Sequence, residues 1–153
     1  MMTDSETAIH SLWHLLSQIT AFTFQAGNGE GSRTDWNGRA AGQVVVTPWE
    51  GGLSFAESGQ YTTPHGQRLA MSNRYGWQRG EQGIRLCHLR FGAPVPLFEL
   101  VPVTARRWQS REPHLCGADH YRAELVLTEQ GFDVEWVITG PRKNERIAYC
   151  YRI

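Results

Sequence analysis

The chain has 153 residues, of which 41% are hydrophobic and 20% charged, and its 15 basic side chains balance 15 acidic ones. This length predicts one domain spanning residues 1–153, with a core of its own. The neutral balance argues against nucleic-acid binding, which needs a basic surface, and no apolar run approaches the roughly 18 residues of a membrane span. The acidic start is unlike a signal peptide, so we expect a cytoplasmic location.

The first predicted element is a short amphipathic helix over about residues 5–18. Asp4 or Ser5 would cap its amino end, and its apolar residues recur at helical spacing. These apolar residues are Ile9, Leu12, Trp13, Leu16 and Ile19.

From residue 19 on, the hydrophobic period changes to two. The segment ITAFTFQA places Phe22 and Phe24 on one face, and similar segments follow at even spacing between short turns. Such strands pair consecutively and antiparallel. We therefore predict an all-β fold: an up-and-down antiparallel β-barrel of eight to ten strands over about residues 19–153, with the helix across an opening or on the outside wall. A closed barrel of this size has no exposed edge and has room for one small ligand. A two-sheet sandwich is the alternative.

Reactive side chains concentrate in the segment HLCGADHY, residues 114–121. His114, Cys116 and His120 are of the types that bind zinc, although their spacing is not that of a structural zinc site. Cys116 between two histidines would alternatively be a thiolate nucleophile. We favour a third interpretation, in which the polar residues form hydrogen bonds at a barrel rim and Cys116 packs as a small hydrophobic side chain. No bound metal is expected.

Strand alternation indicates the direction of some of these side chains. In HYRAELVLT, Tyr121 shares an apolar, and therefore inner, face with the alternate residues that follow, and Asp119 points the same way. Gly117 would mark a bulge that resets the alternation. The directions of His114 and Cys116 therefore stay open.

Four segments, FAESGQY (55–61), NRYGW (73–77), HLCGADHY (114–121) and WVITGPRKNERIAYCYR (136–152), resemble the family of uncharacterised small proteins known as DUF6314. That family is similar to the calycins, the superfamily of lipocalin-like barrels, so the resemblance implies the same fold as the strand pattern. It implies no function. The family's motif positions correspond to Glu57, Gly59, Arg74, Tyr75, His114, Cys116, Asp119, Tyr121, Gly140, Pro141, Lys143, Tyr151 and Arg152.

A barrel would bring polar side chains from several strands around one cavity, inside an apolar lining. Because buried charge is costly unless paired, Arg74 would pair with Glu57 or Asp119 if these residues point inward. If they point outward, Glu57 and Arg74 would form a weak surface pair. The candidate ligand-binding residues are Glu57, Arg74, Tyr75, His114, Asp119, Tyr121 and Lys143. The candidate apolar lining is Phe55, Tyr61, Trp77 and Trp136.

A basic turn follows the strand that contains Trp136. Arg142, Lys143 and Arg146 cluster beside Pro141, which cannot donate to a strand ladder and therefore ends that strand. At a barrel mouth, Lys143 would attract a ligand carboxylate or phosphate as a point charge. Alternatively, the turn is simply solvated.

Two classes of function remain. We favour a binding protein for a small, partly aromatic or acidic molecule over an enzyme. A small enzyme of the lyase, isomerase or hydrolase type would use His114 or Glu57 as general base, with Arg74 or Lys143 holding an anionic group. Haem binding through a cavity histidine is a third alternative. No cofactor, nucleic acid or membrane partner is expected, no catalytic residue is assigned, and a homodimer stays open.

Overall fold

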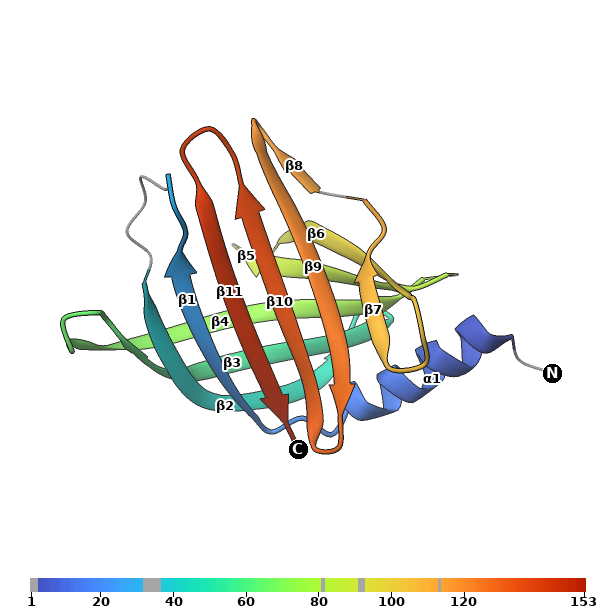
Figure 1. Ribbon diagram of the computed structural model, residues 1–153. Helices are drawn as coiled ribbons and strands as arrows, with labels where there is room; N and C mark the ends of the chain where they lie inside the picture. Colours follow the sequence, from blue (N-terminus) through green and yellow to red (C-terminus); the bar gives the residue numbers. More distant parts are fainter. Residues whose placement is uncertain (1–2, 32–36, 81, 91–92, 113) are drawn as a thin grey trace.

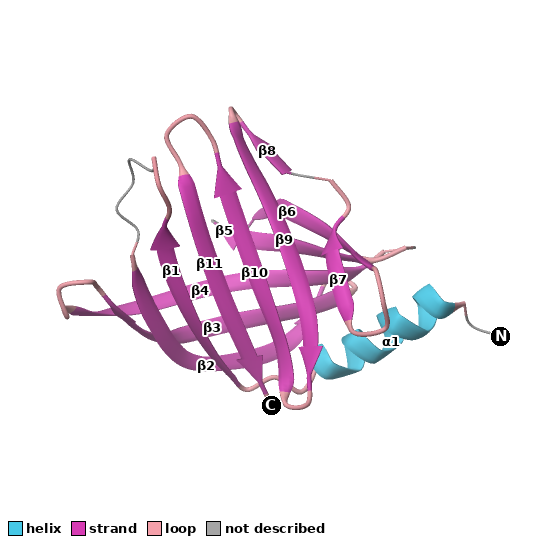
Figure 2. Cartoon of the chain, in the orientation of Figure 1, coloured by secondary structure: helices cyan, strands magenta, loops and turns pink. Residues whose placement is uncertain are grey.

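The structure of the protein, a computed structural model, describes residues 3–31, 37–80, 82–90, 93–112 and 114–153, and for residues 114–116 it describes the backbone alone. One helix and eleven strands make up the described part of the chain (Figures 1 and 2). The elements are α1 (Asp4–Leu16), β1 (Ala21–Asn28), β2 (Gly38–Trp49), β3 (Gly52–Thr62), β4 (Arg68–Arg79), β5 (Ile84–Arg90), β6 (Ala93–Pro102), β7 (Arg107–Ser110), β8 (His114–Cys116), β9 (Asp119–Thr128), β10 (Gly131–Thr139) and β11 (Asn144–Arg152).

Ten of the strands form a closed antiparallel ring. Consecutive strands pair from β1 to β7, β7 pairs with β9, and the ladder continues through β10 and β11 back to β1. Each strand of the ring thus has hydrogen-bonded neighbours on both sides, which removes the exposed edges. The predicted up-and-down barrel is confirmed, and the sandwich alternative is wrong.

The short strand β8 lies outside this ring and forms a hairpin with β9. Cys116 pairs with Asp119 in this hairpin, so only Gly117 and Ala118 connect the two strands. Gly117 has a φ of 62°, a left-handed conformation that glycine adopts without strain. Gly117 therefore does not mark a bulge, the possibility raised from the sequence, because the chain reverses direction there.

The helix begins one residue earlier than predicted. Thr3 is the cap: its side-chain oxygen accepts from the Glu6 N–H, and the Glu6 carboxylate accepts from the Thr3 N–H. This reciprocal pair is a capping box, and its T-x-x-E signature starts at Thr3 rather than at the predicted Asp4 or Ser5. In the described residues, no helix is long and apolar enough to cross a membrane.

The helix packs across one end of the barrel. Ile9, Leu12 and Leu16 are buried and belong to the same hydrophobic core as the strand residues. Figure 1 places α1 at the lower right, beside the turn that joins β9 to β10. The opposite end, called the far end below, lies at the top and left of Figure 1, where β1, β3, β5 and β10 finish and β2, β4, β9 and β11 start.

Strand alternation sends large side chains into the barrel. In β10, Phe132, Val134, Trp136 and Ile138 are all buried while the residues between them are half-buried or exposed. On the other side of the ring, Gly59 faces Gly42 across the β2–β3 ladder, and a Cβ atom at Gly59 would lie 2.1 Å from the carbonyl oxygen of Ala41. Without side chains at this pair, β2 and β3 bend closely past each other.

Candidate functional site

Two carboxyl groups are buried among the described residues, Glu57 and Glu145, and Glu57 is the more deeply buried of the two. Glu57 follows Phe55 on the inner face of β3, and it is 1% exposed. Its partners across the two neighbouring ladders are Val44 in β2 and Asn73 in β4. Strand alternation alone therefore places this acid inside, among residues that are mostly aromatic.

Three tyrosines surround this carboxyl group. Tyr151 donates a hydrogen bond to Glu57 Oε2, and Tyr149 donates one to Glu57 Oε1 at 3.2 Å. The hydroxyl of Tyr75 lies 3.5 Å from that of Tyr149. Because the single hydroxyl proton of Tyr149 points to Glu57, Tyr75 is the donor in the contact with Tyr149. We call Glu57, Tyr75, Tyr149 and Tyr151 the interior cluster.

The interior cluster is nearly dry, and this changes its acidity. Burial raises the pKa of Glu57 to about 7, and the hydrogen bonds from Tyr151 and Tyr149 offset only part of that effect. Burial also raises the pKa of Tyr75 and of Tyr151, and the nearby charge of Glu57 adds to it. Among the described residues, no Lys, Arg or His forms an ion pair with Glu57. The carboxyl therefore exchanges its proton near neutral pH.

Aromatic rings pack over the cluster. The ring centroids of Tyr75, Trp136 and Tyr149 lie 5.8 to 6.3 Å from one another. Tyr151 stacks on Tyr149 at 5.2 Å, and His88, which is half-buried, stacks on Tyr75 at 5.1 Å. Burial, followed by the charge of Arg90, lowers the pKa of His88. These rings form a continuous aromatic layer within the barrel.

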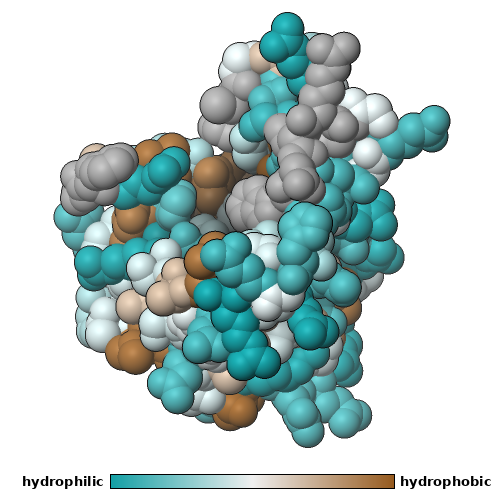
Figure 3. All heavy atoms as spheres, turned by 90° about the vertical axis from the view of Figure 1, so that its left-hand side faces the viewer, coloured by the Kyte–Doolittle hydropathy of each residue, from teal (hydrophilic) through white to brown (hydrophobic). Residues whose placement is uncertain are grey.

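The molecule is hollowed on the side of the far end. Figure 3 shows this hollow, with hydrophobic residues visible inside it. Half-buried residues that pack against the core at this end include Tyr61 of β3, Met71 of β4 and Tyr121 of β9. Within the aromatic layer, His88 is half-buried, and Tyr75 and Trp136 are 7% and 8% exposed. The interior cluster thus lies below a concave surface that α1 does not cover.

A second polar group lies where β9 meets the β10–β11 turn. Lys143 Nζ is 3.6 Å from Asp119 Oδ2, and both side chains are partly exposed. The pKa of Lys143 is raised, first by the charge that Tyr121 acquires when it ionises and then by Asp119 and Glu145, although partial burial opposes this. A Cβ atom at Gly140 would lie 2.0 Å from Asp119 Oδ1. We call Asp119, Tyr121, Gly140 and Lys143 the rim cluster.

The structure brings most of the predicted site residues together, in two groups. Glu57 and Tyr75 belong to the interior cluster, whereas Asp119, Tyr121 and Lys143 belong to the rim cluster. The predicted lining residues also take inner positions: Phe55, Trp77 and Trp136 are buried in the core, and Tyr61 is half-buried.

Arg74 corrects the sequence prediction. It is exposed on the outer face of β4, opposite Ala56, and its Nε donates a hydrogen bond to Ser54 Oγ at 3.0 Å. Neither the internal ion pair with Glu57 or Asp119 nor a surface pair with Glu57 is formed. Neighbouring residues of a strand point to opposite faces, so Arg74 and Tyr75 could not both line one pocket.

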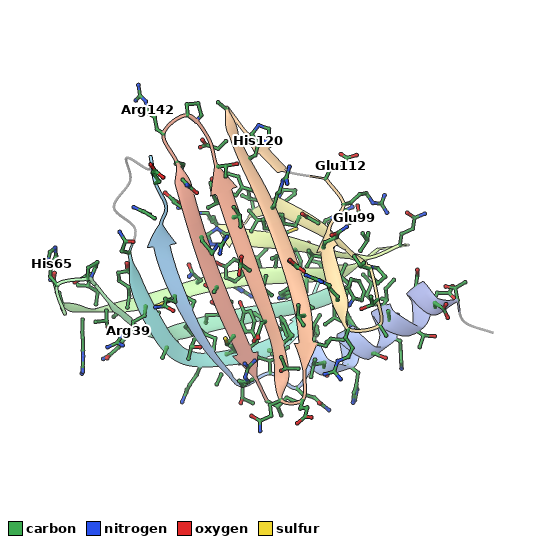
Figure 4. The ribbon with its side chains drawn as sticks, in the orientation of Figure 1. Arg39, His65, Glu99, Glu112, His120 and Arg142 are labelled. Atoms are coloured by element: carbon green, nitrogen blue, oxygen red, sulfur yellow. The ribbon has the colours of Figure 1, made fainter. Side chains whose placement is uncertain are left out.

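The segment 114–121 is described only in part. The side chains of His114 and Cys116 lie outside the described residues, so the zinc, nucleophile and rim interpretations of this segment are all untested. His120 is exposed, near the upper end of β9 in Figure 4. Arg142 points away from the β10–β11 turn in the same view, and Arg146 pairs with Glu135 at 3.3 Å. Lys143 is thus the basic residue of this turn that lies at the barrel rim.

Sequence reasoning missed Tyr149. The last strand alternates Ile147, Tyr149 and Tyr151 with Ala148 and Cys150, and both sets are apolar enough to face a core. The structure buries the first set. Side-chain size could have identified the inner set, since a barrel interior needs bulky side chains and the residues of the second set are small.

Residues 10–152 match the model of DUF6314, a family of unknown function. The chain belongs to this family. No curated protein and no solved structure matches the chain. The calycin-like barrel that the resemblance implies is confirmed by the closed ring of strands.

In this DUF6314 protein, the motif positions acquire distinct structural roles. Glu57, Tyr75 and Tyr151 form hydrogen bonds in the interior, and Gly59 allows β2 and β3 to approach. In the rim cluster, Gly140 leaves room for Asp119 to reach Lys143. Segments far apart in the sequence are therefore joined at two places.

Proposed function

We propose that this DUF6314 protein binds a small, partly aromatic or acidic molecule inside the far end of its barrel. The observation that carries the proposal is the interior cluster, a buried carboxyl with three tyrosine hydroxyls below a concave aromatic surface. A few polar groups set into an apolar lining are the usual composition of a small-molecule pocket. Lys143 supports the acidic alternative, since it would add a cation at the rim.

Two tryptophan substitutions on opposite faces of the sheet test this proposal. Met71 is half-buried and packs against the core, whereas Val45 is 59% exposed on β2. We expect the neutral dye N-phenyl-1-naphthylamine to bind the parent and Val45→Trp saturably, with at least tenfold weaker binding to Met71→Trp. Circular dichroism melts check that both variants fold. Equal dye affinity in the two variants, or no saturable binding to the parent, would contradict the proposal.

A small enzyme of the lyase, isomerase or hydrolase type is the second candidate. The pKa of Glu57, raised to about 7 by burial, favours it because a general acid or base works best when its pKa is near the operating pH. A native mass spectrum of protein purified from its host would identify the bound molecule. If Glu57→Gln stops conversion of that molecule but not its binding, the protein is an enzyme. If the parent returns it unchanged, the protein is a carrier or sensor.

Haem binding is the remaining alternative from the sequence. Of the histidines whose side chains are described, His88 is the one inside the barrel, and its ring stacks on Tyr75. A stacked imidazole is already engaged with a neighbouring ring, so this observation does not favour haem.

A further inference from the structure

The hydrogen bonds of the interior cluster have a direction. Tyr149 donates to Glu57, and Tyr75 therefore donates to Tyr149, so the sequence of donors runs from Tyr75 inward to the carboxyl. The exposed fraction falls along the same path, from 7% at Tyr75 to 4% at Tyr149 and 1% at Glu57. We call this series of hydrogen bonds the relay. At its outer end, the oxygen of Tyr75 can still accept a hydrogen bond, but its one proton is already donated to Tyr149. A ligand group that donates a hydrogen bond therefore fits the outer end of the relay.

The charge of the relay favours the same kind of partner. Two tyrosine hydroxyls stabilise the ionised carboxyl of Glu57 but do not neutralise it, and no described basic side chain pairs with it. A buried charge without a counter-charge is costly. The rings of Tyr75 and Trp136 lie 5.8 Å apart, centroid to centroid, beside the hydrogen-bonded tyrosines, and aromatic rings attract cations through their π faces.

We infer that the molecule bound at the far end carries a positively charged nitrogen beside an apolar or aromatic body, with Tyr75 accepting its N–H and Glu57 supplying the counter-charge. This inference rests on the proposed function and narrows it, since it selects an organic cation over an acid. In the ligand complex, the hydrogen bonds run from the nitrogen to Tyr75, Tyr149 and Glu57 in turn. A ligand carboxylate would instead meet an acceptor oxygen and a like charge.

The titratable groups that face Glu57 are tyrosines, so the ionisation of Glu57 can be followed separately from theirs. Tyr75 approaches from β4, and Tyr149 and Tyr151 from β11; their pKa values are raised, so they stay neutral at ordinary pH. Between these strands, β1 and β2 contribute residues that do not titrate. His88 is the titratable group in contact with Tyr75 on its other side. The core residues that β1 and β2 contribute include Phe22, Phe24, Ala40 and Val44, none of which titrates.

Three probes of matched size separate the possibilities: phenethylamine, which is a cation, 2-phenylethanol, which is neutral, and 3-phenylpropanoate, which is an anion. We expect calorimetry at pH 8 to give at least tenfold tighter binding of phenethylamine than of the other two. If the alcohol or the anion binds as tightly as the amine, the inference is overturned while the proposed function stands. If none of the three binds, the proposed function fails, and the inference fails with it.

Substitutions show which residues cause the preference for phenethylamine. Glu57→Gln should weaken phenethylamine at least tenfold and leave 2-phenylethanol within twofold. Tyr75→Phe should act in the same way, and it serves as the second variant if Glu57→Gln does not fold. Glu135→Gln, which removes an exposed outer-face carboxylate, is the matched control and should change nothing. Equal loss of all three probes in Glu57→Gln and Tyr75→Phe would indicate a structural role and overturn the inference.

The pH profile adds a readout that packing alone would not change. The pKa of Glu57 is about 7 in the free protein because of burial, and only its ionised form matches the cation. Phenethylamine affinity should therefore rise with pH up to about 7 and level off above it. The profile should be flat in Glu57→Gln. A rise that persists in this variant would overturn the assignment to Glu57.

Discussion

The interior cluster and the rim cluster each contain one carboxylate, and their surroundings make these two groups behave differently. Glu57 has hydroxyl partners in a nearly dry interior, so burial raises its pKa to about 7. Asp119 has an ammonium partner, Lys143, and both side chains reach solvent. Enclosure, more than the number of polar partners, therefore sets the chemistry of an acid in this fold.

The largest expected effect concerns the pH dependence of stability. Glu57 has an ordinary pKa of 4.5 when exposed and about 7 when folded. Between these values the unfolded chain loses the proton first, so stability falls as pH rises, by roughly 3 kcal/mol in total, and then levels off. Glu57→Gln should lack this fall. Urea denaturation of both proteins at pH 4.5 and pH 8 measures it; parallel behaviour of the two would contradict the buried acid.

A pair of glycine substitutions compares the tightly paired strands β2 and β3 with the rim cluster. At Gly59 a Cβ atom would meet backbone, which cannot move aside, so Gly59→Ala should destabilise by about 1 to 3 kcal/mol. At Gly140 it would meet the end of the Asp119 side chain, which can rotate away. Gly140→Ala should therefore cost less. Gly27→Ala is the control, since its Cβ atom would have only an ordinary contact. Equal thermal shifts for Gly59→Ala and Gly140→Ala would refute the distinction.

The smallest effect belongs to the rim ion pair. Because Lys143 and Asp119 are partly exposed, water screens their attraction, and such pairs contribute at most about 1 kcal/mol. Lys143→Met and Asp119→Asn should each lower the unfolding free energy by less than that, with a smaller effect at high salt. A loss of several kcal/mol would mean that the rim is as enclosed as the interior.

Most of the fold and about half of the candidate site residues could be predicted from the sequence. The change of period after Ile19 was enough for the barrel, because strand alternation is local. Glu57 and Tyr75 were found by family resemblance, whereas Arg74 was placed wrongly because the same resemblance overrode the alternation of β4. Tyr149 was missed because its contact with Glu57 links β11 to β3, across two intervening strands. No local pattern reports a contact of that kind.

The titration of the Glu57 carboxyl carbon by nuclear magnetic resonance, with and without saturating phenethylamine, measures directly the acidity on which cation binding depends. We predict a Glu57 pKa near 7 in the free protein, as burial requires, and a lower pKa in the presence of the amine, because a nearby cation favours the ionised form. A pKa near 4.5 in the free protein, or one that the amine leaves unchanged, would contradict a buried carboxyl that pairs with a bound cation.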